Sequence, residues 1–211
     1  MSHRPWMTLA LVVTSAALLT NCRPAQNGQR GGDAEKRLAS ATLAGDLDSV
    51  KQVLAAGADP NKMTPYEGHD QSPWKLALRR ARPENKTSTD IVRAMLGAHA
   101  DPEVAFGDEP SRMGSNTYTT QPLEPILEAV SHSSADVVRA LLDAGLDRRK
   151  GQLALVLAVE QGQTDIVHIL VDSGVDVNCH PTANTPLTAA IDTRNVALMT
   201  FLEEHGAREK P

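Results

Sequence analysis

A short sequence word recurs five times along this chain of 211 residues, and this repetition constrains the fold more than any other feature. Within each copy, Val, Ile, Leu or Met residues stand four positions apart, as in Ile91 with Met95 and Val137 with Leu141. Residues four apart lie on one face of an α-helix, so each copy predicts an amphipathic helix. The copies span residues 48–59, 89–101, 135–147, 164–176 and 196–207.

The ends of these predicted helices carry their own signals. An aspartate precedes the apolar stripe in four copies, which predicts its place in the first helical turn, next to the positive end of the helix dipole. These residues are Asp48, Asp90, Asp136 and Asp165. A glycine follows the stripe in four copies, where a helix ends in the left-handed conformation. These residues are Gly57, Gly145, Gly174 and Gly206.

A second word precedes each of these helices, at residues 37–45, 72–78, 124–130, 153–159 and 185–191. Three copies place Pro second, after Ser72, Glu124 or Thr185. A Ser or Thr cap followed by Pro at the first helical position is a helix start, because the hydroxyl accepts a free N–H and Pro loses none. The unit is therefore a helix, a tight turn, a second helix, a glycine stop and a loop.

This unit resembles the ankyrin repeat, through Thr185-Pro186-Leu187, the paired Val/Ile stripe and the ending Gly57-Ala58-Asp59-Pro60-Asn61. The resemblance implies an all-α ankyrin-repeat solenoid of about five repeats with projecting hairpin loops. The predicted ankyrin domain covers residues 34–208, with repeats at about 34–61, 62–102, 103–148, 149–178 and 179–208. Repeat 2 departs from the family pattern at Trp74, Lys75 and His99, the last of which replaces the stop glycine.

Repeats 2 and 3 carry insertions. Successive stop positions lie 42 and 46 residues apart in the first half of the chain, but 29 and 32 apart in the second half. The extra residues fall in 62–71, 79–88 and 103–121. The end repeats need polar outer surfaces, because each repeat buries its apolar face only against a neighbour. Both have suitable residues, which are Glu35, Lys36 and Ser40 in repeat 1 and Glu203, Glu204 and Arg208 in repeat 5.

Residues 1–21 form a predicted export signal. Arg4 precedes the apolar run Met7–Thr20, which has the length of a signal-peptide core and is too short to span a bilayer. The run ends in Leu19-Thr20-Asn21-Cys22, which resembles the lipobox of bacterial lipoproteins and implies a lipid on Cys22, although Asn21 stands where that motif has Gly, Ala or Ser. The alternatives are an ordinary cleaved signal, an uncleaved anchor and a cytoplasmic helix.

The predicted localisation is therefore the bacterial cell envelope, with the protein lipid-anchored and facing the periplasm. A soluble periplasmic or secreted protein is the alternative. Residues 22–33 are rich in Gly, Pro, Gln and Asn and have no apolar period, so we expect a flexible tether between the lipid and the domain.

Composition and motifs favour a non-enzymatic protein. The formal charge of −5 gives no reason to bind nucleic acid. The chain has no phosphate loop, nucleophile elbow or paired catalytic carboxylates, so we predict no catalytic residue, cofactor or metal. The less favoured enzyme or redox reading would use Cys179 and His180, the one adjacent Cys/His pair. With Cys22 lipidated, Cys179 would be a lone thiol exposed to mixed-disulfide formation.

The predicted function is protein binding through the concave face of the first helices, the hairpin tips and the insertions. Aromatic residues on loops of a rigid scaffold suit binding hot spots, although each could instead pin its own loop. The basic cluster at 79–82 is either a solvated helix end or a site that recognises an acidic partner. The cluster at 148–150 lies in a predicted hairpin between repeats 3 and 4, where the resemblance implies a tip that contacts partners. Trp74 aligns with a core position. The predicted binding residues are Tyr66, Glu67, His69, Arg79, Arg80, Phe106, Tyr118, Arg148 and Arg149.

Two versions of this function stay open. In one, the protein is an inhibitor or immunity factor that occludes a toxin or enzyme in the periplasm. In the other, it is a scaffold that holds a periplasmic enzyme near the membrane, as bacterial periplasmic ankyrin proteins linked to oxidative-stress defence suggest by resemblance. An adjacent toxin gene or an adjacent catalase gene would distinguish them.

Overall fold

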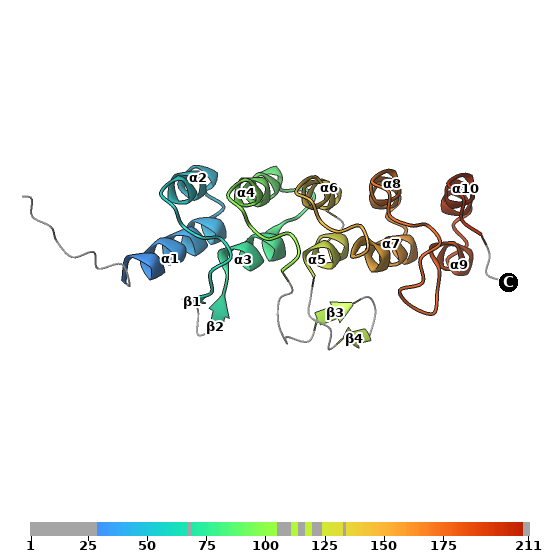
Figure 1. Ribbon diagram of the computed structural model, residues 1–211, viewed down its shortest axis with the longest axis horizontal. Helices are drawn as coiled ribbons and strands as arrows, with labels where there is room; N and C mark the ends of the chain where they lie inside the picture. Colours follow the sequence, from blue (N-terminus) through green and yellow to red (C-terminus); the bar gives the residue numbers. More distant parts are fainter. Residues whose placement is uncertain are drawn as a thin grey trace, which may run out of the picture.

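The helices stack in pairs to form two rows. The computed structural model describes residues 29–66, 69–104, 111–113, 117–119, 124–132 and 134–208. Figure 1 shows one row made by the first helix of each pair and a second row made by its partner. The first helices are α1 (Gln29–Ala44), α3 (Pro73–Arg80), α5 (Pro125–Ser131), α7 (Gly151–Glu160) and α9 (Pro186–Asp192). The second helices are α2 (Leu47–Ala55), α4 (Lys86–Gly97), α6 (Ala135–Asp143), α8 (Thr164–Asp172) and α10 (Val196–Glu204). The predicted all-α solenoid is confirmed.

Capping interactions place the predicted helix starts. The Ser72 hydroxyl accepts a hydrogen bond from the N–H of Lys75 at 3.1 Å, at the start of α3. At the start of α9, the Thr185 hydroxyl accepts from the N–H of Thr188 at 3.1 Å, and the Thr188 hydroxyl accepts from the N–H of Thr185 at 2.7 Å. The reciprocal pair satisfies two helix-end donors at once. Glu124 precedes α5 without a side-chain cap bond.

The predicted glycine stops are confirmed by their backbone conformation. Gly57, Gly145, Gly174 and Gly206 have φ angles of 91°, 97°, 86° and 88°. His99 adopts the same left-handed region, with a φ of 64°, where the other copies have glycine. A side chain is strained in this region, so repeat 2 keeps the stop geometry at some energetic cost.

Two helix starts differ from the prediction. Asp48, Asp136 and Asp165 lie in first turns, but α4 begins at Lys86, which puts Asp90 in the second turn. The insertion provides the reason, because the Asn85 side chain accepts from the N–H of Ser88 at 3.2 Å and caps the helix one turn earlier. Helix α1 begins at Gln29, inside the expected tether, since no proline interrupts residues 29–44 and extending a formed helix requires little free energy.

The core is a continuous layer of small aliphatic residues between the two rows. Val137 and Leu141 are 0% exposed, as the predicted stripe requires. Leu142, next to Leu141 on α6, is half-buried. Trp74 is also 0% exposed, and its indole N–H donates to the carbonyl of Asp101 at 2.9 Å. The prediction that Trp74 belongs to the core agrees with this burial.

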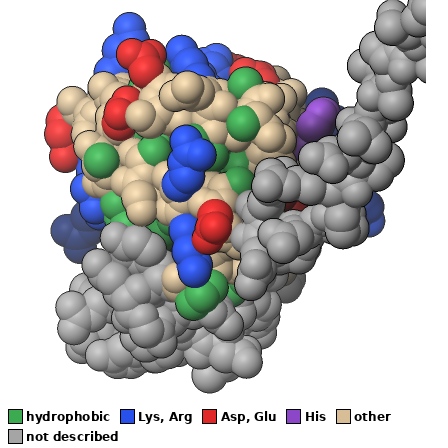
Figure 2. Space-filling view, turned by 90° about the vertical axis from the view of Figure 1, so that its left-hand side faces the viewer, with side chains coloured by type: hydrophobic (Ala, Val, Ile, Leu, Met, Phe, Trp, Pro, Cys, Tyr) green, Lys and Arg blue, Asp and Glu red, His purple; other side chains and the backbone are tan. Residues whose placement is uncertain are grey.

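The N-terminal end of the stack is polar. Figure 2 views this end, where Lys, Arg, Asp and Glu side chains lie over α1 and α2 among scattered hydrophobic ones. Lys36 and Ser40 are exposed, as expected. The expectation for Glu35 is wrong, because it is 3% exposed and accepts from the N–H of Asp59 at 3.5 Å, with Lys62 at 3.5 Å. Glu35 therefore faces repeat 2 rather than solvent.

The C-terminal end is less completely polar. The predicted cap residues Glu203, Glu204 and Arg208 are exposed. Val196 is nevertheless 70% exposed and Ile191 is 36% exposed. The last repeat thus leaves part of its apolar face uncovered by the described residues.

The described helices include none that is both long and apolar enough to cross a membrane. The predicted signal peptide and Cys22 lie outside the described residues. Their assignment therefore stays a prediction.

Neighbouring leucines on α6 test the packing. Leu141→Ala should lower the free energy of unfolding by about 2–5 kcal/mol, because it opens a cavity in the core. Leu142→Ala makes the same chemical change at a half-buried position and should lower it by about 1 kcal/mol. Urea unfolding followed by circular dichroism measures both. Equal losses would contradict the assignment of Leu141 to the inter-row core.

Candidate functional site: the hairpin-side surface

Two β-hairpins project from the row of first helices, on the side away from the second helices (Figure 1). Strand β1 (Thr64–Tyr66) pairs antiparallel with β2 (His69–Gln71) immediately before α3. Strand β3 (Ser111–Met113) pairs antiparallel with β4 (Thr117–Thr119) between α4 and α5. The strands occupy two of the three predicted insertions. We call the surface formed by the first helices and both hairpins the hairpin-side surface.

Most of the predicted aromatic and acidic contact residues cannot be placed as side chains. Tyr66 and His69 face each other in the register of the first hairpin, and Tyr118 lies opposite Arg112 in the second. Only the backbone of these residues is described. Glu67 and Phe106 lie outside the described residues. The roles predicted for these residues in binding stay predictions.

Asparagine side chains join the loops that follow successive repeats. Asn61 donates through Nδ2 to the carbonyl of His99 at 2.9 Å and accepts through Oδ1 from the N–H of Asp101 at 2.8 Å. Asn178 makes the same pair of bonds to Gly206 and Arg208, at 3.0 Å each. An amide suits this position because it donates and accepts together.

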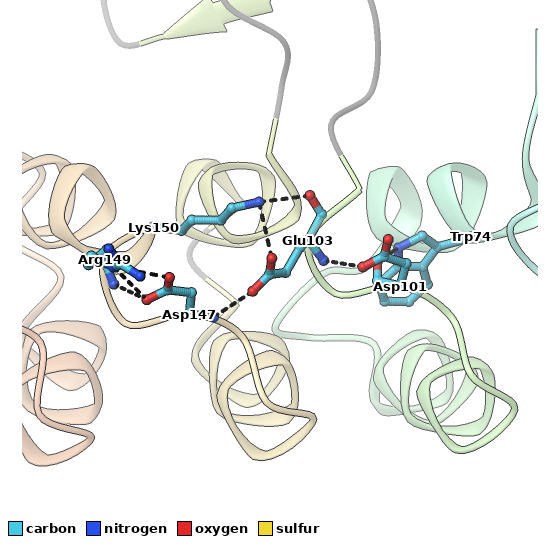
Figure 3. A network of polar contacts seen from close by, with 6 residues as sticks. All are labelled: Trp74, Asp101, Glu103, Asp147, Arg149 and Lys150. Carbon is cyan, nitrogen blue, oxygen red and sulfur yellow. Dashed lines mark hydrogen bonds and ion pairs between the residues drawn. The ribbon is translucent and has the colours of Figure 1, made fainter.

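A charged pair replaces the asparagine where the loop after repeat 2 meets the loop after repeat 3 (Figure 3). The Glu103 carboxylate accepts from the N–H of Asp147 at 2.9 Å. Lys150 donates to the backbone carbonyl of Glu103 at 3.0 Å, and its Nζ lies 3.6 Å from Oε2 of Glu103. A carboxylate cannot donate, so Lys150 supplies the positive group that this bridge otherwise lacks. Sequence reasoning missed this bridge, although Glu103 at the asparagine position was a readable signal.

The predicted basic cluster at 148–150 is therefore largely engaged within the chain. Arg148 donates through Nε to the carbonyl of Ser173, and Arg149 pairs with Asp147 at 3.2 Å. Both arginines are exposed. Burial raises the pKa of Glu124 at the start of α5, while Lys150 opposes this rise. The loop network is thus a local balance of opposite charges, and contact of Arg148 and Arg149 with a partner stays a prediction.

Another group of charges lies where α3 contacts α5. Arg79 and Arg80 end α3; Arg79 is half-buried and Arg80 is exposed. Arg82 follows the helix, and its Nη1 donates to the carbonyls of Arg79 at 2.8 Å and Ala81 at 2.9 Å. This contact holds the guanidinium of Arg82 against the negative end of the helix dipole.

Glu128 of α5 faces these cations. Glu128 is 8% exposed. Burial raises the pKa of its carboxyl, whereas the positive charges of Arg79, Arg82 and Lys75, in decreasing order, lower it. His132, directly after the end of α5, has its Nε2 3.9 Å from Oε1 of Glu128. Burial lowers the pKa of His132, and Arg82 and Arg79 lower it further. We call Lys75, Arg79, Arg80, Arg82, Glu128 and His132 the α3–α5 charge cluster.

Cys179 and His180 differ in exposure. Cys179 is 3% exposed, and its thiol donates to the carbonyl of Gln152 at 3.7 Å, whereas His180 is exposed. Burial raises the pKa of the Cys179 thiol to about 11. The expectation that Cys179 forms mixed disulfides is therefore wrong for the folded domain, because reagents cannot easily reach the thiol and little of it is in the reactive thiolate form. The described residues contain no group of three His, Cys, Asp or Glu residues placed to hold a metal ion.

Comparison with known families adds to this geometry. A family model described as ankyrin repeats, in three copies, matches residues 77–181 and 126–210. The matched region runs from within α3 to residue 210, beyond α10, and covers more than half of the chain. No curated protein matches the chain.

The bridge made by Glu103 gives a prediction for stability. Glu103→Ala should lower the free energy of unfolding by about 1–2 kcal/mol, because the N–H of Asp147 loses its acceptor. Glu103→Gln keeps an acceptor oxygen and should lower it by less. Urea unfolding of both variants measures the difference, and amide exchange at Asp147 reports the lost bond directly. Identical stability of the alanine variant and the unmodified protein would contradict the bridge.

The burial of Cys179 predicts that its thiol is alkylated slowly in the folded protein. In a Cys22→Ser background, alkylation of the native protein by iodoacetamide at pH 8 should be roughly a hundredfold slower than for free cysteine, because little thiolate forms. Unfolding in urea should restore the ordinary rate. Mass spectrometry measures the labelled fraction over time, and rapid labelling of the folded protein would show that the thiol is accessible.

Proposed function

Because the chain belongs to the ankyrin repeat family, whose members are protein–protein interaction modules, we propose that it binds a partner protein on the hairpin-side surface without catalysing a reaction. The observation that carries this proposal is the position of the insertions. Both hairpins project from the first helices, on one side of the stack (Figure 1). An insertion elsewhere would not enlarge a single surface.

The stack is suited to rigid recognition. Its core residues, such as Val137 and Leu141, are fully buried, and bridges such as those of Asn61 and Glu103 fix the loops that follow successive repeats. A preformed surface loses little conformational entropy on binding, so a few anchor residues suffice for affinity. Loops on a rigid scaffold are also where binding residues concentrate.

We further propose that the protein is located in the bacterial cell envelope, where a lipid on Cys22 holds the domain at the membrane. The support is the apolar run Met7–Thr20 followed by Cys22. In this setting the protein acts as a scaffold for, or an inhibitor of, a periplasmic protein, including an immunity role against a toxin. The burial of Cys179 argues against the alternative of an enzyme that uses this thiol as a nucleophile.

Site-specific photocrosslinking in living cells tests the binding surface. A photoreactive amino acid placed at Tyr66 or Tyr118 should capture one dominant partner protein. The same amino acid at Thr87 or Thr200, which are exposed positions on second helices, serves as the control and should not capture it. No partner from any position, or equal capture from all four, would contradict the hairpin-side surface.

The same cells test the proposed localisation and the effect of the protein on its partner. Cys22→Ala should move the protein from the membrane fraction to the soluble fraction, and retention in the membrane would contradict the lipid anchor. The activity of the captured partner is then measured with and without the purified protein. Loss of activity identifies an inhibitor, whereas unchanged activity with altered location identifies a scaffold.

A further inference from the structure

We propose that the partner is a protein embedded in the same membrane as the lipid anchor, and that the first hairpin binds its periplasmic face close to the bilayer. This inference rests on the proposed function and on the proposed lipid at Cys22. It goes beyond them in naming where the partner is located and which side of the stack reaches it.

Helix α1 leaves only a short connection to Cys22. The helix begins at Gln29, so six residues, 23–28, separate it from the cysteine. A chain of this length spans at most about 25 Å, even when fully extended. A helix that began at Ala34, where the sequence places the start of the domain, would have left eleven residues. The domain is therefore held closer to the anchored cysteine than the sequence suggests.

The connection leaves the stack on the side of the hairpins. Helix α1 has 16 residues, whereas α3, α5, α7 and α9 have 7 to 10. Glu35, in the first half of α1, accepts from the N–H of Asp59 at 3.5 Å and pairs with Lys62 at 3.5 Å. Both partners directly precede the first hairpin, and α1 also contacts strand β1. In Figure 1 the first turns of α1 accordingly point toward the hairpins and away from the second helices.

These contacts limit the distance between the first hairpin and the membrane. Glu35 lies six residues along α1 from Gln29, about 9 Å along the axis. Lys62, which pairs with Glu35, stands two residues before β1, and Tyr66 ends that strand. Tyr66 therefore lies within about 65 Å of Cys22 in every orientation of the domain. A site that binds the first hairpin must be found in this layer next to the bilayer.

A partner embedded in the membrane suits this restriction. Its periplasmic face stays in the layer that the first hairpin reaches, so the anchor raises the effective concentration of the domain around it. A soluble partner gains no such advantage. A folded soluble domain of 100 residues is also about 30–35 Å across, which exceeds the space that a connection of about 25 Å allows between α1 and the bilayer. The short connection and its exit on the hairpin side therefore favour the embedded partner.

Lengthening the connection tests this inference in living cells. A flexible Gly/Ser segment of 40 residues is inserted between Asn27 and Gly28, and photocrosslinking from Tyr66 is repeated. Capture of the partner should fall about tenfold, because effective concentration falls roughly as the −3/2 power of linker length. Cys22→Ala removes the anchor and should lower capture at least as much. The same 40 residues added after Pro211 are the matched control and should leave capture unchanged.

The location of the partner provides a second measurement. In cells that lack this protein, the partner should remain in the membrane fraction after a sodium carbonate wash, as an embedded protein does. A partner found in the soluble fraction would overturn the inference. Capture that is unaffected by the longer connection, or reduced equally by the C-terminal addition, would also overturn it.

These outcomes distinguish the two proposals. A soluble partner captured equally well with either connection would leave the proposed function standing, while the inference fails. If the unmodified protein captures no partner, the proposed function fails and the inference fails with it. If the Cys22→Ala variant stays in the membrane fraction, the lipid anchor is wrong, and the inference fails even where a partner is captured.

Discussion

Burial of apolar surface between neighbouring helix pairs is the interaction on which the rest of the structure depends. A pair such as α5 and α6 has no core of its own, and side chains such as Leu141 are buried because further pairs lie on both sides. The almost complete absence of aromatic residues, 3% of the chain, means that Ala, Val, Leu and Ile supply this contact. Small side chains allow neighbouring helix pairs to pack closely. Repeated from pair to pair, this packing produces two rows of helices, each with one face turned away from the other row (Figure 1).

The polar loops hold the array in register. Asn61 and Asn178 each satisfy one carbonyl and one N–H of the following loop, which the stacked helices leave without a partner. Glu103 and Lys150 perform this task with charges, and Glu35 serves the first loop from within α1. The same contact is thus made by an amide or by a carboxylate that pairs with a lysine. What is required is an acceptor at that point, and the chemistry that supplies it varies from one loop to the next.

The proposed binding surface follows from the position of two of the three insertions. These two form the hairpins beside the row of first helices, on the side away from the second helices (Figure 1). Both hairpins emerge there, and the α3–α5 charge cluster lies at the far end of the helix that the first hairpin precedes. Burial disfavours the charged form of the Glu128 carboxyl and raises its pKa, while the neighbouring cations act in the opposite direction.

The local sequence was sufficient to predict most helix starts and stops, because these depend on neighbours within one turn: the spacing of Val137 and Leu141, the hydroxyls of Ser72 and Thr185, and the conformational freedom of Gly145. The starts of α1 and α4 were the exceptions. It also located the insertions and the basic run at 79–82. Only the tertiary structure decided which polar residues are buried. Glu35 and Cys179 look like surface residues in the chain, yet each has a partner from the adjoining repeat, Lys62 for Glu35 and Gln152 for Cys179. Glu128 likewise meets Arg79 and Lys75 only once α5 lies against α3. Such contacts depend on how one repeat is positioned on the next, and no local pattern within a repeat encodes that position.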